Sequence, residues 1–404
     1  MKADTSRSSN SNGRAASSGL ADIHAPVMLA EVLDALLPER AEADVARQAG
    51  PLRLLDGTLG LAGHASALLE RAATRGLQAE LLGLDRDAEA QALAAERLMP
   101  FGRAVHLRQS AFADFRTALD DLGWDFLDAA LVDLGVSSLQ LDSPERGFSF
   151  LHDGPLDMRM DPHGGGESAA TLVNRAPVAR LKEIIEQYGE EPQAGRIARA
   201  IDDARSAQAI ESTAQLAAIV ERAYPPKWRA TARNHPATRT FQALRLAVNG
   251  ELEQLGLFLE RIVPRLRPGG RLAVISFHSL EDRMVKHFFR TAASGCLCPP
   301  HLAVTMEQCR CGHQASLRLV TRKALEPSEA EVRRNSRARS AKLRVAERIE
   351  GEFSLPAASE GAGLEFFEAP GKAGKAGEAG GRGRRQEYGR GSGHGSKRPR
   401  GGRR

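Results

Sequence analysis

The sequence predicts an α/β fold: a Rossmann-like, doubly wound parallel sheet that is interrupted by an inserted helical domain. Short apolar runs alternate strictly with amphipathic helical segments over residues 52–133, which is typical of a parallel sheet with helices on both faces. Asp56, Asp85 and Asp133 each end one of these apolar runs. A purely helical pattern over 177–224 then breaks the alternation, and this indicates the insertion.

The first half of the sheet follows from the alternation. An amphipathic helix is expected to open at His24, to carry its apolar residues on one face and to end at Pro38. The short apolar runs predict buried parallel strands, and the segments between them predict helices. The predicted strands cover 52–55, 79–84, 104–108 and 128–133, and the predicted helices cover 63–75, 87–98 and 113–122.

The second half is less regular. Residues 142–172 are rich in Gly, Pro, Asp and Met, which predicts a structured loop. The helical pattern of 177–224 is expected to stop at Pro225-Pro226. The elements predicted beyond it are a helix over about 238–267, a turn at Pro268-Gly269-Gly270, a strand over 271–277, a helix from Leu280 and a last hairpin within 317–349.

These patterns divide the chain into five regions. Residues 1–22 form a disordered lead, 23–142 the first part of the sheet domain and 143–236 an inserted helical domain for substrate recognition. Residues 237–350 form the second part of the sheet domain, with a cysteine-bearing loop at 295–313, and 351–404 form a disordered Gly/Arg-rich basic tail.

Charge is distributed unevenly along the chain. The net charge is +5, yet residues 371–404 alone carry 11 Lys or Arg against two acids, a net +9, which leaves −4 on the rest. A tail of this kind attracts polyanions without selecting a sequence. Four cysteines in 404 residues exclude a disulfide scaffold. No apolar stretch approaches the roughly 18 residues of a membrane span, so a cytoplasmic protein without a membrane partner is expected.

A glycine loop follows the first predicted strand. Gly57, Gly60 and Gly63 do not have the spacing of a dinucleotide site, and Asp56 would repel a pyrophosphate. A carboxylate there suits a cationic ligand without phosphate, such as S-adenosylmethionine, and Asp85 stands where an acid accepts ribose hydroxyls. A structural turn with helix-capping acids is the alternative, and a nicotinamide-binding fold is favoured less.

Asp133 is the candidate catalytic residue. An exocyclic base amine is a poor nucleophile because its lone pair is delocalised into the ring, so it needs an acceptor for its N–H and close alignment with the methyl group. A carboxylate at the end of the fourth strand is sufficient for that role. The alternative, that Asp133 only contacts the cofactor, remains open.

Several longer motifs carry a family resemblance. The chain resembles the bacterial small-subunit ribosomal RNA cytidine-N4-methyltransferase family, RsmH or MraW, from about His24 to Arg348. The motifs are Asp133-Leu134-Gly135-Val136-Ser137-Ser138, Glu145-Arg146-Gly147-Phe148-Ser149-Phe150, Asp153-Gly154-Pro155-Leu156-Asp157-Met158-Arg159-Met160-Asp161, His235-Pro236-Ala237-Thr238-Arg239-Thr240-Phe241 and Ile275-Ser276-Phe277-His278-Ser279-Leu280-Glu281-Asp282-Arg283.

The resemblance implies a fold, an activity and a set of contacts. It implies an S-adenosylmethionine-dependent methyltransferase sheet and methylation of one cytidine in the decoding centre of 16S ribosomal RNA, with the small ribosomal subunit as partner. The sequence departs from the family at Leu61-Ala62, where Arg-Gly is more usual, and Ala62 is expected to tolerate the turn only with a negative φ. The implied cofactor contacts are Ala62, Gly63, His64, Asp85, Phe112, Asp133 and Gln140.

Arginines and phenylalanines of the loop after Asp133 are candidates for substrate binding, because aromatic rings beside arginines suit an extruded base and its phosphates. The alternative is a loop whose phenylalanines fill the junction between domains. The candidates are Arg146, Phe148, Phe150, Arg159 and, further on, Arg239.

Two Cys-x-Cys pairs form a third constellation. Thiolates paired across a short loop bind tetrahedral zinc in other proteins, although Cys-x-x-Cys is the more typical spacing. Reduced, metal-free cysteines are the equal alternative, and no metal site is assigned from the sequence. The pairs are Cys296 with Cys298 and Cys309 with Cys311.

Other functions stay open at this stage. They are a methyltransferase for another nucleic acid or for a protein side-chain amide, and an RNA-binding assembly factor that keeps the fold without the activity. The intact acids Asp56, Asp85 and Asp133 weigh against the last of these.

Overall fold

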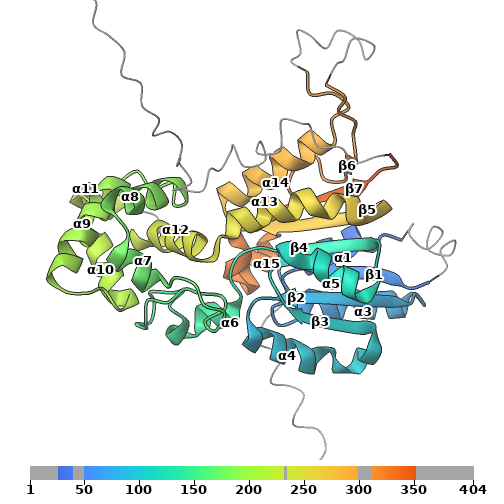
Figure 1. Cartoon of the computed structure of the whole chain (residues 1–404), viewed down its shortest axis with the longest axis horizontal. Coiled ribbons are helices and arrows are strands. Elements are labelled where there is room, and N and C mark those ends of the chain that lie inside the picture. The colour runs from blue at the N-terminus through green and yellow to red at the C-terminus, as the bar shows by residue number, and fades with distance from the viewer. Residues whose placement is uncertain (1–25, 40–49, 232–233, 299–310, 352–404) are drawn as a thin grey trace, which may run out of the picture. The chain divides into compact units, whose positions relative to one another are not determined.

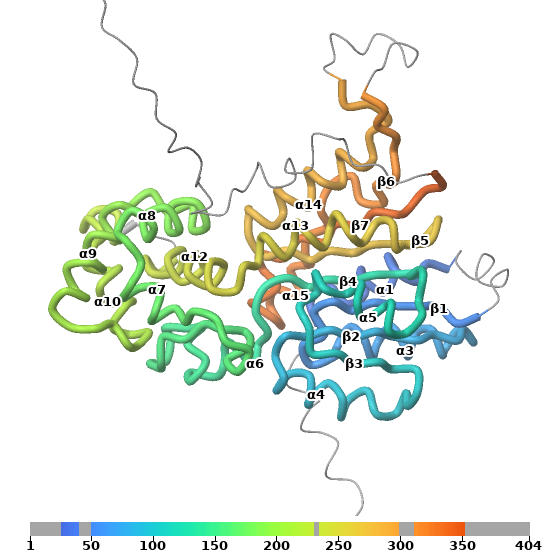
Figure 2. Tube along the Cα trace, viewed as in Figure 1, coloured from blue at the N-terminus to red at the C-terminus, as the bar shows by residue number. Residues whose placement is uncertain are grey.

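A computed structural model of the chain describes residues 26–39, 50–231, 234–298 and 311–351, all within one compact unit (Figures 1 and 2). The predicted lead and almost all of the predicted tail lie outside the described residues. A seven-stranded sheet has the order β3-β2-β1-β4-β5-β7-β6. Strand β7 runs antiparallel to the other six strands. The strands are β1 (Leu52–Asp56), β2 (Ala79–Asp85), β3 (Val105–Gln109), β4 (Leu127–Asp133), β5 (Leu266–Ser276), β6 (Leu317–Leu319) and β7 (Lys342–Arg348).

Helices cover both faces of the sheet, because successive strand residues point to opposite sides. Leu55 and Val132 face one hydrophobic cluster, whereas Leu54 and Leu131 face the other. The first face is covered by α5 (Phe115–Leu122), α13 (Glu251–Ile262) and α14 (Ser279–Ala292), and the second by α1 (Leu29–Leu36), α3 (Gly63–Thr74) and α4 (Ala88–Leu98). The predicted α/β class with a doubly wound sheet is confirmed.

A separate group of helices follows β4 in the chain (Figure 1). Its contacts run between α8 and α9, between α9 and α10, and from α12 back to α7, α8 and α10. The boundaries predicted for the inserted domain stay a prediction. The group comprises α7 (Ala169–Arg175), α8 (Val178–Gln187), α9 (Ala194–Ala207), α10 (Thr213–Ala223), α11 (Pro226–Thr231) and α12 (Ala237–Asn249), while the short α6 (Ser138–Asp142) precedes it and α15 (Glu329–Arg334) precedes β7.

Two local predictions were wrong. The helix expected over 238–267 is two helices, because Gly250 adopts a left-handed conformation with φ 61° between α12 and α13. The turn at Pro268-Gly269-Gly270 is a bulge inside β5, where Leu127 pairs with Leu266 but Ala129 already pairs with Arg271. The helical pattern does stop before Pro225-Pro226, since α10 ends at Ala223, but a short helix that was not predicted, α11, begins at Pro226, where proline is tolerated because the first helical N–H has no partner to lose.

The strand order places a crevice beside the ends of β1 and β4. The chain leaves β1 toward β2 and β3 and then returns to β4 on the other side of β1. Ligands of open α/β sheets bind at such a switch point, beyond the carboxyl ends of the strands. None of the described helices is long and apolar enough to cross a membrane.

Candidate functional site

The loop after β1 runs tightly against β4. The backbone N–H of Gly57 donates to the carbonyl oxygen of Leu131 at 2.9 Å. A Cβ on Gly57 would lie 2.8 Å from Cγ1 of Val132 and 3.1 Å from Cβ of Phe112, which is closer than side chains approach. Glycine is therefore required here by the close approach of the two strand ends.

Ala62 occupies a strained position at the start of α3. Its φ of 58° and ψ of 30° are left-handed, so the expectation of a negative φ was wrong. An alanine pays about 1–2 kcal/mol for this conformation, and its backbone N–H donates to the carbonyl oxygen of Leu59 at 2.7 Å within the turn. The turn geometry is thus kept although the sequence lacks the glycine that would adopt it freely.

Asp56 and Asp85 close the back of the crevice. Burial, opposed by a hydrogen bond from the Thr58 backbone and assisted by the charge of Asp85, raises the pKa of Asp56 to about 7. Asp85 accepts the backbone N–H of Gly60 at 2.7 Å on Oδ2 and that of Asp87 at 2.8 Å on Oδ1. Burial also raises the pKa of Asp85. Each Asp85 oxygen keeps a lone pair that can accept a further hydrogen bond.

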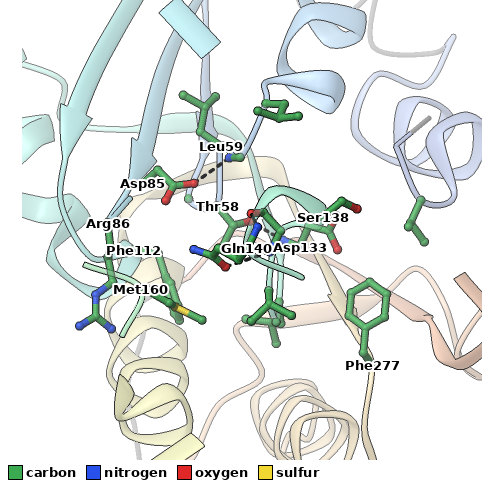
Figure 3. A pocket seen from close by; sticks show the side chains of 18 of the residues that line it. Thr58, Leu59, Asp85, Arg86, Phe112, Asp133, Ser138, Gln140, Met160 and Phe277 are labelled. Carbon is green, nitrogen blue, oxygen red and sulfur yellow. Dashed lines mark hydrogen bonds between the residues drawn. The ribbon is translucent and has the colours of Figure 1, made fainter. Parts of the chain in front are cut away.

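Asp133 ends β4 and lies in the cavity lining near Gln140 (Figure 3). Its Oδ2 lies 3.8 Å from Nδ1 of His64, and its buried Oδ1 has no hydrogen-bond partner among the described residues. Burial first, and then the charges of Asp56 and Glu281, raise the pKa of Asp133 well above its usual value. Within the described part of the chain, the site thus holds a carboxyl group with one oxygen whose acceptor capacity is unused.

His64 is held in one tautomer. Its Nε2 lies 2.9 Å from the carbonyl oxygen of Val27, and because a carbonyl only accepts, Nε2 carries the proton and Nδ1 presents a lone pair toward Asp133. Burial lowers the pKa of His64 to about 4. A neutral imidazole therefore stands beside a carboxyl group whose pKa is raised.

Gln140 joins the loop after β4 to the start of α4. Its Oε1 accepts the backbone N–H of Ser137, and its Nε2 donates to Oδ2 of Asp87 at 2.9 Å. The same Asp87 oxygen lies 2.7 Å from Nη1 of Arg146. Arg146 also donates to the carbonyl oxygens of Arg159 and Met160 and is buried. We therefore regard Arg146 as a residue that positions the loop.

A cavity of about 440 Å³ lies between these side chains, within the range of small-molecule sites. Six predicted cofactor residues line it, whereas Asp56 and Ala62 lie behind its wall. The residues Met160, Arg245, Glu251, Phe277 and Glu281 also line it and were not predicted, because they follow from the packing of α12, α13 and α14 near the sheet. The predicted residues that line it are Gly63, His64, Asp85, Phe112, Asp133 and Gln140.

None of the five predicted substrate residues lines the cavity. Phe148 is buried beneath the guanidinium of Arg146, and Arg159 forms two hydrogen bonds to Asp157. Phe150 packs against His235 and Phe241, with ring centroids 4.7 and 4.9 Å away. Arg239 is exposed and donates to the carbonyl oxygen of Glu190. Their roles in substrate binding stay predictions.

Arg245 lines the cavity but was not among the predicted site residues. Its Nε donates to Oε1 of Glu251 at 2.8 Å, while its buried Nη2 has no partner in the described part of the chain. The charge of Arg245 also acts on Glu281. Burial alone would raise the pKa of Glu281, but His278, Arg245 and the backbone N–H of Phe277 together lower it. The cavity therefore combines carboxylates with one arginine that retains an unused donor.

These residues fit S-adenosylmethionine. Burial and, to a smaller extent, neighbouring acidic charges raise the pKa values of Asp56, Asp85 and Asp133, so these groups favour a bound cation, and S-adenosylmethionine carries a sulfonium and an ammonium. Asp85 retains acceptor capacity for two hydroxyls. Phe112, which lies edge-on to Phe258 at 5.5 Å, offers an apolar wall to an adenine ring.

Comparison with known proteins agrees with this site. The sequence model of the MraW methylase family matches residues 21–349. A protein of Nitratidesulfovibrio vulgaris (strain Miyazaki F) called ribosomal RNA small subunit methyltransferase H is 58% identical over 337 residues, covering 83% of this chain and 89% of that protein. A protein of the same name from Oleidesulfovibrio alaskensis is 58% identical, covering 81% and 95%, and one from Lawsonia intracellularis is 50% identical, covering 81% and 99%.

The family predicted from the sequence motifs and the predicted cofactor are thereby confirmed. The chain belongs to the MraW methylase family and is an S-adenosylmethionine-dependent methyltransferase.

Proposed function

We propose that this protein methylates the exocyclic N4 amine of one cytidine in the decoding centre of 16S ribosomal RNA. The class of RNA is supported by its relatives, which are named as methyltransferases of small-subunit ribosomal RNA. The observation that carries the choice of an amine is Asp133 in the lining of the cavity, where its side chain is 24% exposed and accepts no hydrogen bond on Oδ1 from the described residues. A carboxylate oxygen there can accept an N–H from an amine, which turns the amine lone pair toward the methyl group.

The chemistry assigned to the chain is alignment and proton uptake. S-adenosylmethionine, when bound, supplies an electrophilic methyl group. The backbone N–H of Asp133 donates to Oγ1 of Thr58 at 2.6 Å, which fixes the strand end. As the amine gives up a proton, the carboxylate of Asp133 can accept it. The neutral imidazole of His64, whose Nδ1 lies 3.8 Å from Oδ2 of Asp133, adds no positive charge beside it.

The cofactor is assigned to the predicted set of residues that line the cavity. Asp85 would accept hydrogen bonds from the ribose hydroxyls, and Phe112 would contact the adenine. Gly63 has no Cβ, so its backbone could approach the ligand closely. Gln140 would act through its bonds to Asp87 and Ser137, which hold the loop beside the cavity.

The inserted helices are assigned to RNA recognition. Arg245 of α12 lines the cavity, so it is a better candidate for a phosphate of the target nucleotide than Arg146 or Arg159, which do not line it and whose guanidinium groups are bound internally. Arg239 and Phe150, nearer the surface, remain candidates for neighbouring nucleotides. The assembled small subunit is the proposed partner.

Mass spectrometry of nucleosides tests the proposal. Purified protein, S-adenosylmethionine and either naked 16S RNA or small subunits that lack the modification are incubated, and the RNA is digested. N4-methylcytidine at one position is expected. 5-Methylcytidine, a methylated adenosine or methylation of protein alone would contradict the assignment, and cofactor binding without product on either substrate would favour an assembly factor.

A further inference from the structure

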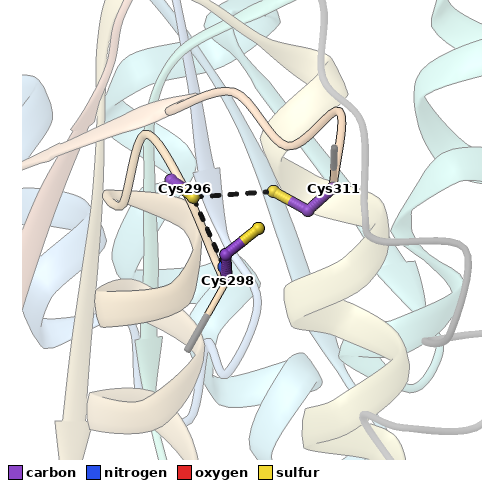
Figure 4. A group of neighbouring side chains, drawn as sticks. All are labelled: Cys296, Cys298 and Cys311. Atoms are coloured by element: carbon purple, nitrogen blue, oxygen red, sulfur yellow. Dashed lines mark hydrogen bonds between the residues drawn. The ribbon is translucent and has the colours of Figure 1, made fainter. Parts of the chain in front are cut away.

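A cluster of thiols lies outside the cavity. Cys296 and Cys298 follow α14, and Cys311 precedes β6 (Figure 4). Their sulfur atoms all lie within 4.8 Å of one another, and none of the three residues lines the cavity. The function derived above uses none of them.

The separation of the sulfurs matches a metal site. Sγ of Cys311 lies 3.8 Å from Sγ of Cys296, which is far beyond the length of about 2.05 Å of a disulfide. Sulfurs bound to zinc at about 2.3 Å with tetrahedral angles stand about 3.8 Å apart. The Cys296–Cys311 pair therefore matches one edge of that tetrahedron, and the sulfur of Cys298, within 4.8 Å of both, is available for a third corner.

Backbone amides support the sulfurs. The N–H of Cys298 donates to Sγ of Cys296 at 3.3 Å, and the N–H of Leu297 donates to Sγ of Cys311 at 3.5 Å. Donors directed at sulfur stabilise the thiolate, the form that binds a metal. Such outer contacts also orient metal ligands.

The stem below the cysteines is firmly held. The backbone N–H of Ser316 donates to the carbonyl oxygen of Ala292 at 2.8 Å, and Nε2 of the buried His313 donates to that of Thr291 at 2.9 Å. These bonds join the end of α14 to the residues before β6, so Cys296 and Cys311 meet because the stem brings them together.

We propose that Cys296, Cys298 and Cys311 bind a structural zinc ion that closes the loop between α14 and β6. Soft thiolates select Zn²⁺ over magnesium or calcium, and the cysteines are only partly exposed or at the surface, where an ion can enter. The fourth cysteine of the sequence, Cys309, lies outside the described residues. The ion fastens two ends of a loop and takes no part in methyl transfer.

Elemental analysis of the full chain, purified under reducing conditions without added metal, tests the site. About one zinc per chain is expected, and Cys296→Ser and Cys311→Ser should each reduce it at least fivefold. Leu297→Ala is the matched control, because its backbone N–H, which bonds to Cys311, is unchanged. Replacement by Co²⁺ should give strong thiolate charge-transfer absorption that both serine variants weaken.

Two further measurements keep this result separate from the proposed function. The dissociation constant for S-adenosylmethionine should change less than twofold in Cys311→Ser, whereas its melting temperature should lose the response to a zinc chelator that the wild type shows. Metal-free wild-type protein, thiols that are alkylated equally fast with and without chelator, or a Cys296–Cys311 disulfide in peptide mass spectrometry would each overturn the zinc site.

Discussion

At the residue scale, the carboxyl groups of the cavity are held where their charged forms are disfavoured. Burial raises the pKa of both Asp56 and Asp133. The charge of Asp85 raises the pKa of Asp56 further, and the charges of Asp56 and Glu281 raise that of Asp133 further. Such a cluster binds a cation without needing an aromatic cage, because the cation relieves repulsion that the folded protein has already accumulated. The same cluster excludes phosphate groups from the back of the cavity.

Replacement of Asp133 separates alignment from cofactor binding. Asp133→Asn should lower the single-turnover methylation rate by about 10²–10⁴-fold, the usual range for a positioned acid or base. Cofactor affinity should fall by a smaller factor, about tenfold, because one of several carboxylates loses its charge. Calorimetry and rapid-quench kinetics measure the two effects. Asp114→Asn, an exposed acid outside the cavity, is the control, and proportional losses of rate and affinity would make Asp133 a cofactor ligand only.

Asp56 predicts a dependence on pH. Because its folded pKa of about 7 exceeds its ordinary value of 3.8, the folded state holds the proton more tightly than the unfolded state. Its contribution to stability is therefore greatest below pH 4 and is lost as the pH rises to about 7. A bound cation lowers this pKa, so cofactor binding near pH 7 should release protons and tighten between pH 6 and 8.

Calorimetry in two buffers of different ionisation enthalpy counts those protons. Asp56→Asn should abolish most of the release, and above pH 7 it should melt at a higher temperature than the wild type, since the amide can still accept the Thr58 N–H. Equal binding enthalpies in both buffers for the wild type would show that Asp56 is already ionised in the free protein.

At the element scale, the loop between β1 and α3 depends on how closely its neighbours pack. A Cβ on Gly63 would lie 2.5 Å from Cγ of Pro26, just before α1, whereas a Cβ on Gly256 of α13 would meet nothing within 4 Å. Gly63→Ala should thus lower the free energy of unfolding by about 1–3 kcal/mol through overpacking. Gly256→Ala should raise it by up to about 1 kcal/mol through helix propensity.

Urea denaturation of both variants checks this opposition of sign. Gly63→Ala should also weaken cofactor binding, because Pro26 and Gly63 both line the cavity. Unchanged stability and affinity in Gly63→Ala would mean that Pro26 moves aside freely.

Elements set by local pattern were predictable, and elements set by distant packing were not. The strand ends at Asp56, Asp85 and Asp133 are predicted by the apolar runs that precede them in the sequence. The partner of Arg146 is Asp87, 59 positions earlier, and no local pattern couples the two. Arg245 reaches the cavity because Gly250 breaks a helix that the periodicity alone continues.

At the scale of the whole molecule, the cavity is completed by parts of the chain far apart in sequence. Its carboxylates come from β2, β4, α13 and α14, and Arg245 comes from α12. Helix α12 contacts α7, α8 and α10 and also contacts α13. It therefore connects the helical group to the cavity. This arrangement is suited to sensing RNA at the helices while the methyl group is held at the sheet.

The net positive charge of the chain is carried by its C-terminal residues. Residues 371–404, outside the described residues, carry a net +9, and the rest of the chain carries −4. Each single-strand phosphate that they neutralise adds about −0.7 to the slope of log affinity against log salt. A chain that ends at residue 370 should therefore bind 16S RNA more weakly at low salt and with a flatter slope.

A full-length variant with glutamine at every Lys and Arg of 371–404 should behave like the truncated chain, because charge and not length supplies the affinity. The methylated position and the turnover rate at saturating substrate should stay unchanged in both, since the cavity residues determine them. Equal salt slopes for all three proteins would show that these residues do not contact RNA, and a shifted methylation site would show that they take part in selecting the cytidine.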